Sequence, residues 1–263
     1  EAFMEEIRLE RARELFGDSH PCACGGGHEI CLKCNVCRAH EPDRLFSPAD
    51  GLASAIDATI LKADAREEDI RALCNMANKY RTASVCINSQ YIELIDKLLE
   101  DSIRSCTVIN FPLGAGSVEA ISAEAKAVIQ AGVDEVDMVQ NLAALLSGQI
   151  ETAYESIRRV AEACQSQTVL LKVILETCYL DREQLIVSCL LAKKAGAHFV
   201  KTSTGFGTGG ATEENIALMR EVVGPKIGVK ASGGVRTKEQ ALAMIAAGAN
   251  RIGASNAAAI VED

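Results

Sequence analysis

Short apolar segments alternate with longer amphipathic segments along most of this chain. Eight apolar segments, rich in residues that favour strands, begin about 22 to 35 residues apart. They span residues 55–61, 83–88, 105–111, 135–141, 169–175, 198–204, 226–232 and 251–255. Because apolar residues run almost continuously through them, these segments predict parallel strands that are buried on both faces.

The segments between the predicted strands have the period and length of helices. Clear examples cover residues 67–80, 117–132, 181–196 and 237–248, and the last three end in Ala-Gly, a common helix C-terminus. Eight alternating strand and helix units predict an α/β fold, specifically a TIM (β/α)8 barrel over residues 49–263. An open doubly wound sheet is the main alternative, but no GxGxxG motif follows the first segment.

Residues 1–48 have a different composition and predict an N-terminal extension. Residues 1–17 have the pattern of a short amphipathic helix. The stretch after them is rich in Gly, Cys and His and predicts a linker or a small knuckle held by a structural Zn²⁺. Four ligands chosen from its five Cys, His28 and His40 could hold the ion, and the candidate set is Cys24, Cys31, Cys34 and Cys37. A disulfide-bearing or metal-free linker is the alternative, and an iron–sulfur cluster is disfavoured because the expected downstream Cys-Pro is missing.

Composition and charge narrow the classes of function. The net charge of −9 and the lack of a basic stripe argue against binding of nucleic acid. No apolar run approaches the length that spans a membrane. Six of the 11 cysteines stand singly in apolar segments, where free thiols are common, so we expect a reducing, cytoplasmic environment.

Three lysines lie within predicted strands, where an ammonium group is costly to bury. Lys172, Lys201 and Lys230 follow one another at intervals of 29 residues. One βα unit per interval places them on three neighbouring strands at similar height, and all three can point into the barrel. A single lysine in such a strand is usually a strand-end or snorkelling residue, which is our interpretation of Lys62. Three together favour a functional site.

The surroundings of these lysines predict their chemistry. Burial and like charge both lower the pKa of a lysine, so that one amine of the cluster can lose its proton and act as a nucleophile. Asp137, on the fourth predicted strand, can pair with the cluster and move protons, and Glu176 is a possible partner for Lys172. Asp57 is a further polar residue, expected late in the first predicted strand. A free amine beside a second ammonium and a carboxylate is what Schiff-base chemistry on a carbonyl substrate requires.

Glycine-rich turns follow the last three predicted strands. A TIM barrel forms its active site at the carboxyl ends of the strands and commonly binds phosphate beside the last of them. Glycines there let backbone N–H groups approach an anion, although each turn alone would indicate only a tight βα connection. The candidate phosphate-binding residues are Gly205, Gly233, Gly234, Gly253 and Ser255.

Taken together, these motifs resemble the deoxyribose-phosphate aldolases, a family of class I aldolases. The similarity covers residues 53–259, and its most specific pieces are "EVDMV", "LLKVILET", "FVKTSTGF" and "KASGGVRT". The resemblance implies that Lys201 forms the Schiff base and that Lys230 keeps Lys201 unprotonated. It also implies that Asp137 is the acid of the proton relay, with Lys172 hydrogen-bonded in the same network, and that the glycine-rich turns bind the phosphate.

The resemblance also implies a reaction and its setting. The reaction is the reversible cleavage of 2-deoxy-D-ribose 5-phosphate to glyceraldehyde 3-phosphate and acetaldehyde, with no cofactor for catalysis. The chain departs from some members at Phe206, where they carry a phosphate-facing lysine, and from the usual pattern at Asn256, where a second serine is expected. A homodimer is expected from the same likeness.

Other functions and other roles for the extension remain open at this point. Another Schiff-base aldolase or a transaldolase would act on a different sugar phosphate, and a barrel without catalysis would serve as a scaffold. Residues 1–17 resemble the peptides that load enzymes into bacterial microcompartments. The alternative is a helix that packs on its own barrel or on a sister subunit.

Overall fold

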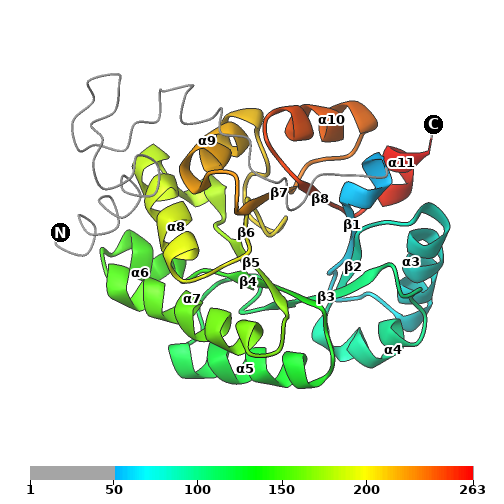
Figure 1. Cartoon of the computed structure of the whole chain (residues 1–263), viewed down its shortest axis with the longest axis horizontal. Helices are drawn as coiled ribbons and strands as arrows, with labels where there is room; N and C mark the ends of the chain where they lie inside the picture. The colour runs from blue at the N-terminus through cyan, green and yellow to red at the C-terminus, as the bar shows by residue number, and fades with distance from the viewer. Residues whose placement is uncertain (1–50, 263) are drawn as a thin grey trace.

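The computed structural model describes residues 51–262, which form a closed barrel of eight parallel strands (Figure 1). The strands are β1 (Ile56–Ile60), β2 (Ser84–Ile87), β3 (Arg104–Ile109), β4 (Glu135–Val139), β5 (Leu170–Ile174), β6 (Phe199–Lys201), β7 (Gly228–Ser232) and β8 (Arg251–Ala254). They follow one another around the barrel in chain order, and β8 closes the ring by pairing with β1. The predicted TIM barrel is therefore confirmed, and the open sheet is excluded.

Helices surround the barrel on the outside (Figure 1). The α-helices are α3 (Glu67–Tyr80), α4 (Ile92–Asp96), α5 (Val118–Gln130), α6 (Leu142–Leu146), α7 (Ile150–Gln165), α8 (Arg182–Lys194), α9 (Glu213–Val223), α10 (Lys238–Ala246) and α11 (Ala257–Val261). Short 3₁₀ helices are η1 (Leu52–Ala55), η2 (Ser89–Tyr91) and η3 (Thr177–Tyr179).

Local sequence signals set the ends of several helices. At the start of α8, the Asp181 side chain accepts a hydrogen bond from the backbone N–H of Gln184 at 2.8 Å, and the Gln184 side chain accepts one in return. The Ala-Gly pairs end α5, α8 and α10 as predicted, because Gly132, Gly196 and Gly248 adopt the left-handed φ that a helix terminus favours.

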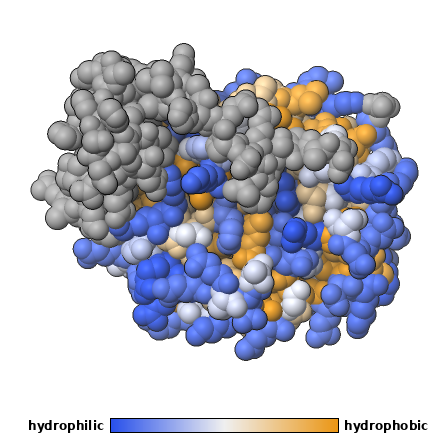
Figure 2. Space-filling model, in the orientation of Figure 1, coloured by the Kyte–Doolittle hydropathy of each residue, from blue (hydrophilic) through white to orange (hydrophobic). Residues whose placement is uncertain are grey.

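The main core lies between the barrel and the helices. It is one continuous cluster of buried apolar side chains, to which every strand contributes. A smaller cluster of Leu61, Cys86, Cys106 and Val108 lies apart from it. Charged and polar residues cover much of the outer surface on the face that Figure 2 shows, with apolar residues between them. Most apolar packing therefore lies between the outer face of the barrel and the helices, whereas the charged side chains described below lie inside the barrel.

The strands agree closely with the apolar segments of the sequence. Seven strands lie within their predicted segments, and β3 begins one residue before its segment. The predicted helix over residues 1–17 and the division at residue 48 lie outside the described residues, so both stay predictions.

Candidate active site

Three lysine ammonium groups meet on one carboxylate inside the barrel. Lys172, Lys201 and Lys230 belong to the neighbouring strands β5, β6 and β7. The Nζ atom of Lys172 lies 2.7 Å from Oδ1 of Asp137. The Nζ atoms of Lys201 and Lys230 each lie 2.8 Å from Oδ2 of the same residue. All four side chains are buried, so the structure brings together the four predicted catalytic residues.

The register of the strands explains how these side chains meet. Asp137 is paired with Lys172 across β4 and β5, and Lys201 is paired with Lys230 across β6 and β7. Lys172 itself is paired with Phe199, two residues before Lys201. Lys201 and Lys230 therefore share the expected register position, whereas Lys172 lies two residues earlier in register than Lys201.

Two further charged residues complete the interior, and the sequence analysis missed both. The Nζ atom of Lys172 lies 2.6 Å from Glu135, the first residue of β4. Arg251, the first residue of β8, donates from Nε to Asp57 at 2.7 Å and from a terminal nitrogen to Glu135 at 2.9 Å. Both lie at the starts of their strands, whereas the active site of a TIM barrel is expected at the carboxyl ends. The two-residue period of a strand, which puts Glu135 on the same side as Asp137, was the available signal.

Two sequence expectations are wrong in their partners or positions. Glu176 does not pair with Lys172; its carboxylate accepts hydrogen bonds from the backbone N–H and the hydroxyl of Thr204. Its left-handed φ of 53° accompanies this turn after β5. Asp57 was expected late in its strand but is the second residue of β1, where it contacts Lys230 at 2.6 Å.

The interior charges control one another's protonation. Burial alone would raise the pKa of Asp137, but Lys172, Lys201 and Lys230 hold it well below its usual range. Burial disfavours the ammonium form of Lys172 and Lys230, yet nearby carboxylates, Asp137 foremost, raise the pKa of both above the usual value. The predicted lowering of lysine pKa is therefore wrong for these two residues, because Asp57 contacts both and Glu135 contacts Lys172, in addition to Asp137.

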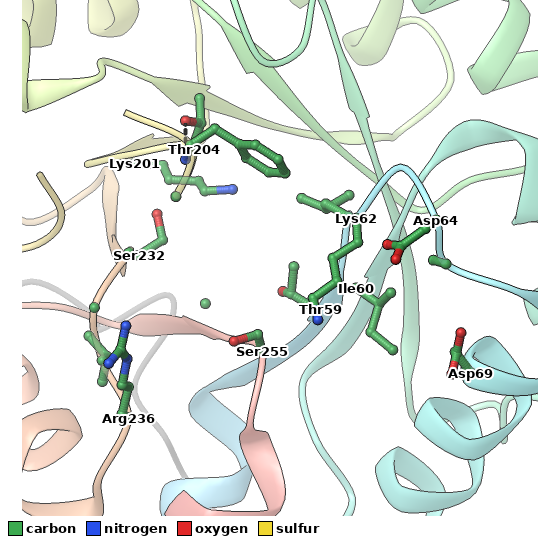
Figure 3. Close-up of a pocket in the computed structure, with 18 residues that line it drawn as sticks. Thr59, Ile60, Lys62, Asp64, Asp69, Lys201, Thr204, Ser232, Arg236 and Ser255 are labelled. Atoms are coloured by element: carbon green, nitrogen blue, oxygen red, sulfur yellow. Dashed lines mark hydrogen bonds between the residues drawn. The ribbon is translucent and has the colours of Figure 1, made fainter. Parts of the chain in front are cut away.

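Lys201 differs from its two neighbours in contacts and access. Its ammonium pairs with Asp137, whereas Lys230 has two carboxylate partners and Lys172 has three within 4.0 Å. Of the three lysines, only Lys201 lines the cavity of about 740 Å³ at this end of the barrel. Figure 3 shows its side chain extending into that cavity. Lys201 is thus the lysine held by the fewest anions and the one that a substrate can reach.

The predicted phosphate-binding residues lie in the wall of the same cavity. All five line it, namely Gly205, Gly233, Gly234, Gly253 and Ser255. Gly234 has a φ of 85°, a left-handed conformation that glycine adopts at little cost. Two cationic side chains, Lys62 and Arg236, line the cavity as well, and neither forms an ion pair within residues 51–262. The sequence analysis gave Lys62 no role and did not consider Arg236.

One group of potential metal ligands lies in the barrel interior. Ligand atoms of Cys86, Cys106 and Asp137 lie within 4.8 Å of one another. Both oxygens of Asp137 already contact lysine ammonium groups, and the positive charge of these groups opposes the binding of a metal ion. The predicted Zn²⁺ ligands in the extension lie outside the described residues. In the described part of the chain, no helix has both the length and the apolar character needed to cross a membrane.

The chain is similar to known aldolases in sequence. The model of the DeoC/LacD family aldolases matches residues 52–260. A deoxyribose-phosphate aldolase of Clostridium novyi (strain NT) is 54% identical over 208 residues, which cover 79% of this chain and 93% of the relative. One of Thermoanaerobacter sp. (strain X514) is 51% identical over 214 residues, with 81% and 96% covered.

Among solved structures, the tetrameric deoxyribose phosphate aldolase from Aeropyrum pernix superposes with a TM-score of 0.76 at 37% identity. The match covers 84% of this chain and 93% of that one. Sequence and structure agree over the whole barrel. The chain therefore belongs to the DeoC/LacD family of aldolases.

Proposed function

We propose that the chain cleaves 2-deoxy-D-ribose 5-phosphate reversibly to glyceraldehyde 3-phosphate and acetaldehyde through a Schiff base on Lys201. One observation carries the proposal: a buried lysine with a single carboxylate partner lines a cavity that glycine-rich turns enclose. The names of the two sequence relatives support the choice of substrate.

The first half of the proposed reaction uses Lys201 as nucleophile. Its free amine attacks the C1 aldehyde, and loss of water from the adduct leaves a protonated imine. The imine accepts the electron pair of the breaking C2–C3 bond and becomes an enamine, so the reaction needs no metal as electron sink. Lys172 and Lys230 stay protonated because carboxylates raise the pKa of both, which leaves Lys201 to supply the amine.

The second half of the proposed reaction moves protons through Asp137. This carboxylate takes the proton of the C3 hydroxyl, through a water molecule, as the C2–C3 bond breaks. It then helps to protonate the enamine at C2, and hydrolysis of the resulting imine releases acetaldehyde. Asp137 is suited to this role because its contact with Lys201 places it beside the reacting nitrogen.

The phosphate of the substrate would bind beside the glycine-rich turns that line the cavity. Gly233, Gly234 and the other glycines of these turns have no side chain to keep an anion from their backbone N–H groups. Arg236 and Lys62 would add positive charge, since neither is neutralised by an ion pair in the described chain. Phe206 also lines the cavity, where it packs edge-on against Phe111 at a centroid distance of 5.4 Å.

Turnover measurements on matched lysine variants test the proposal. We expect Lys201→Leu to abolish release of glyceraldehyde 3-phosphate, whereas Lys226→Leu, at an exposed position before β7, keeps the wild-type rate. Cleavage of other sugar phosphates alone would favour the rival aldolase or transaldolase. A wild-type protein that cleaves no sugar phosphate would favour the scaffold.

We also propose the setting that the sequence predicts. The enzyme would act in the cytoplasm, or inside a bacterial microcompartment through residues 1–17, as a homodimer. A structural Zn²⁺ would occupy the cysteines of the extension. Because the Aeropyrum pernix relative is tetrameric, light scattering of the purified chain distinguishes a dimer from a tetramer. Metal analysis of the same sample tests the Zn²⁺.

A further inference from the structure

The buried ion pairs of the barrel interior form one connected set, which we call the charge network. Its members are the side chains joined to one another by nitrogen–oxygen distances of 4.0 Å or less within the barrel. They are Asp57, Glu135, Asp137, Lys172, Lys201, Lys230 and Arg251. The network therefore contains four basic side chains and three carboxylates, and it carries one excess positive charge when every member is ionised.

A buried set of charges is most stable when it is neutral, because an uncompensated charge in a medium of low dielectric is costly. The charge network becomes neutral when one basic member loses its proton. Arg251 cannot be that member, because a guanidinium stays protonated in proteins. The loss of a proton must then fall on one of the three lysines.

Arg251 is built into the network by several contacts. Its guanidinium donates two hydrogen bonds to Asp57 and two, of 2.9 and 3.2 Å, to Glu135. It also lies over the ring of Phe199, 6.0 Å from the centroid. Asp57 and Glu135 are the same carboxylates that contact Lys230 and Lys172 at 2.6 Å. Arg251 thus competes with two lysines for negative charge, although it does not line the substrate cavity.

We infer that Arg251 is a positioning residue that keeps the amine of Lys201 unprotonated by holding a permanent positive charge in the charge network. Lys201 is the lysine that yields its proton because it has one carboxylate partner, whereas Lys230 has two and Lys172 has three. The inference rests on the proposed role of Lys201 as the Schiff-base lysine.

With one exception, the other titratable groups near the network do not alter this balance. Glu176, the remaining buried carboxyl, is engaged with Thr204. Arg104 approaches Glu135 at 3.9 Å, but its side chain is 59% exposed and its charge is screened by water.

The thiols and the imidazole that face the network are Cys86, Cys106 and His198. Burial raises the pKa of Cys106, and burial together with Lys172 lowers that of His198, so neither adds charge at neutral pH. Cys86 is the exception, because a hydrogen bond with Cys106 lowers the pKa of Cys86, and a thiolate there would offset part of the excess positive charge.

The test compares the pH dependence of kcat/KM for 2-deoxy-D-ribose 5-phosphate in three variants. Arg251→Gln removes the permanent cation, so we expect the apparent pKa on the acid side of the profile to rise by about one unit. At a pH below that pKa, kcat/KM should fall about tenfold and recover as the pH increases. Arg251→Lys keeps a cation and should restore most of the wild-type profile. Glu135→Gln removes an anion and should shift the same apparent pKa downward.

Opposite shifts in Arg251→Gln and Glu135→Gln would support the inference, because general damage to the fold lowers the rate at every pH without such a pattern. Unchanged apparent pKa values in both variants, or shifts of the same sign, would overturn it. If Arg251→Gln does not fold, the direction of the shift in Glu135→Gln decides alone. Failure of the proposed function is distinct, since wild-type protein would then give no borohydride-stable adduct on Lys201.

Discussion

Replacement of Asp137 by Asn perturbs the site without changing its shape. In the wild type, one carboxylate contacts three ammonium groups at 2.7, 2.8 and 2.8 Å. Breaking a buried ion pair by removing one partner costs about 3–5 kcal/mol. Because a lysine of the network can relieve part of this cost by losing its proton, we expect Asp137→Asn to lower the free energy of unfolding by about 3 kcal/mol at pH 7. The Tm should fall by about 6–12 °C.

The same variant should separate two steps of the reaction. Without the negative charge of Asp137, a lysine amine loses its proton more readily, so Lys201 should still form a Schiff base that borohydride can trap. Loss of the general acid–base should nevertheless lower kcat by about 10²–10⁴-fold. The assays are turnover of 2-deoxy-D-ribose 5-phosphate and mass spectrometry of the reduced protein. A variant that keeps the wild-type kcat, or that forms no adduct while remaining folded, would refute this reasoning.

Stability at low pH provides a second check on Asp137. Its pKa is depressed in the folded protein, so its stabilising contribution is present above the unfolded value of about 4 and is lost as the pH falls below it. The difference in unfolding free energy between the wild type and Asp137→Asn should therefore narrow below about pH 4. Asp96→Asn, at an exposed position on α4, is the matched control and should track the wild type throughout.

Three further substitutions test other parts of the structure. Lys230→Leu removes a cation beside Asp137, so kcat/KM at pH 7 should fall at least about tenfold and recover at higher pH; a wild-type profile would contradict the role of Lys230. Arg236→Leu should raise KM about 10–100-fold for the phosphorylated sugar but leave cleavage of unphosphorylated 2-deoxyribose unchanged, and an equal effect on both would exclude a phosphate contact. Gly228→Ala places a Cβ 2.2 Å from the ring of buried Phe199, so calorimetry should show that the free energy of unfolding falls by about 1–3 kcal/mol. An unchanged free energy of unfolding would mean that the ring can move aside without cost.

The sequence predicted the barrel well because its strands carry a strong and repeated signal. Each strand is buried on both faces, so its segment is apolar almost throughout, and Gly-terminated helices separate the segments. The interval of 29 residues placed the three lysines on neighbouring strands correctly, since one interval spans one βα unit.

The charge balance of the site could not be predicted in the same way. It depends on strand register, which brings Glu135, at the start of one strand, to Lys172 and brings Arg251, at the start of another, to Glu135. Long side chains then close distances that no sequence spacing encodes. The cations Lys62 and Arg236 were underestimated for a similar reason, because they reach the cavity from loops whose paths the sequence pattern does not fix.

Borohydride reduction in the presence of 2-deoxy-D-ribose 5-phosphate, followed by peptide mapping, tests the central claim most directly. The claim is that Lys201, and not Lys172 or Lys230, supplies the amine. We predict one adduct, located on Lys201 and absent from Lys201→Leu. An adduct on Lys172 or Lys230, or a wild-type enzyme that cleaves the sugar and yet yields no trapped lysine, would contradict the claim.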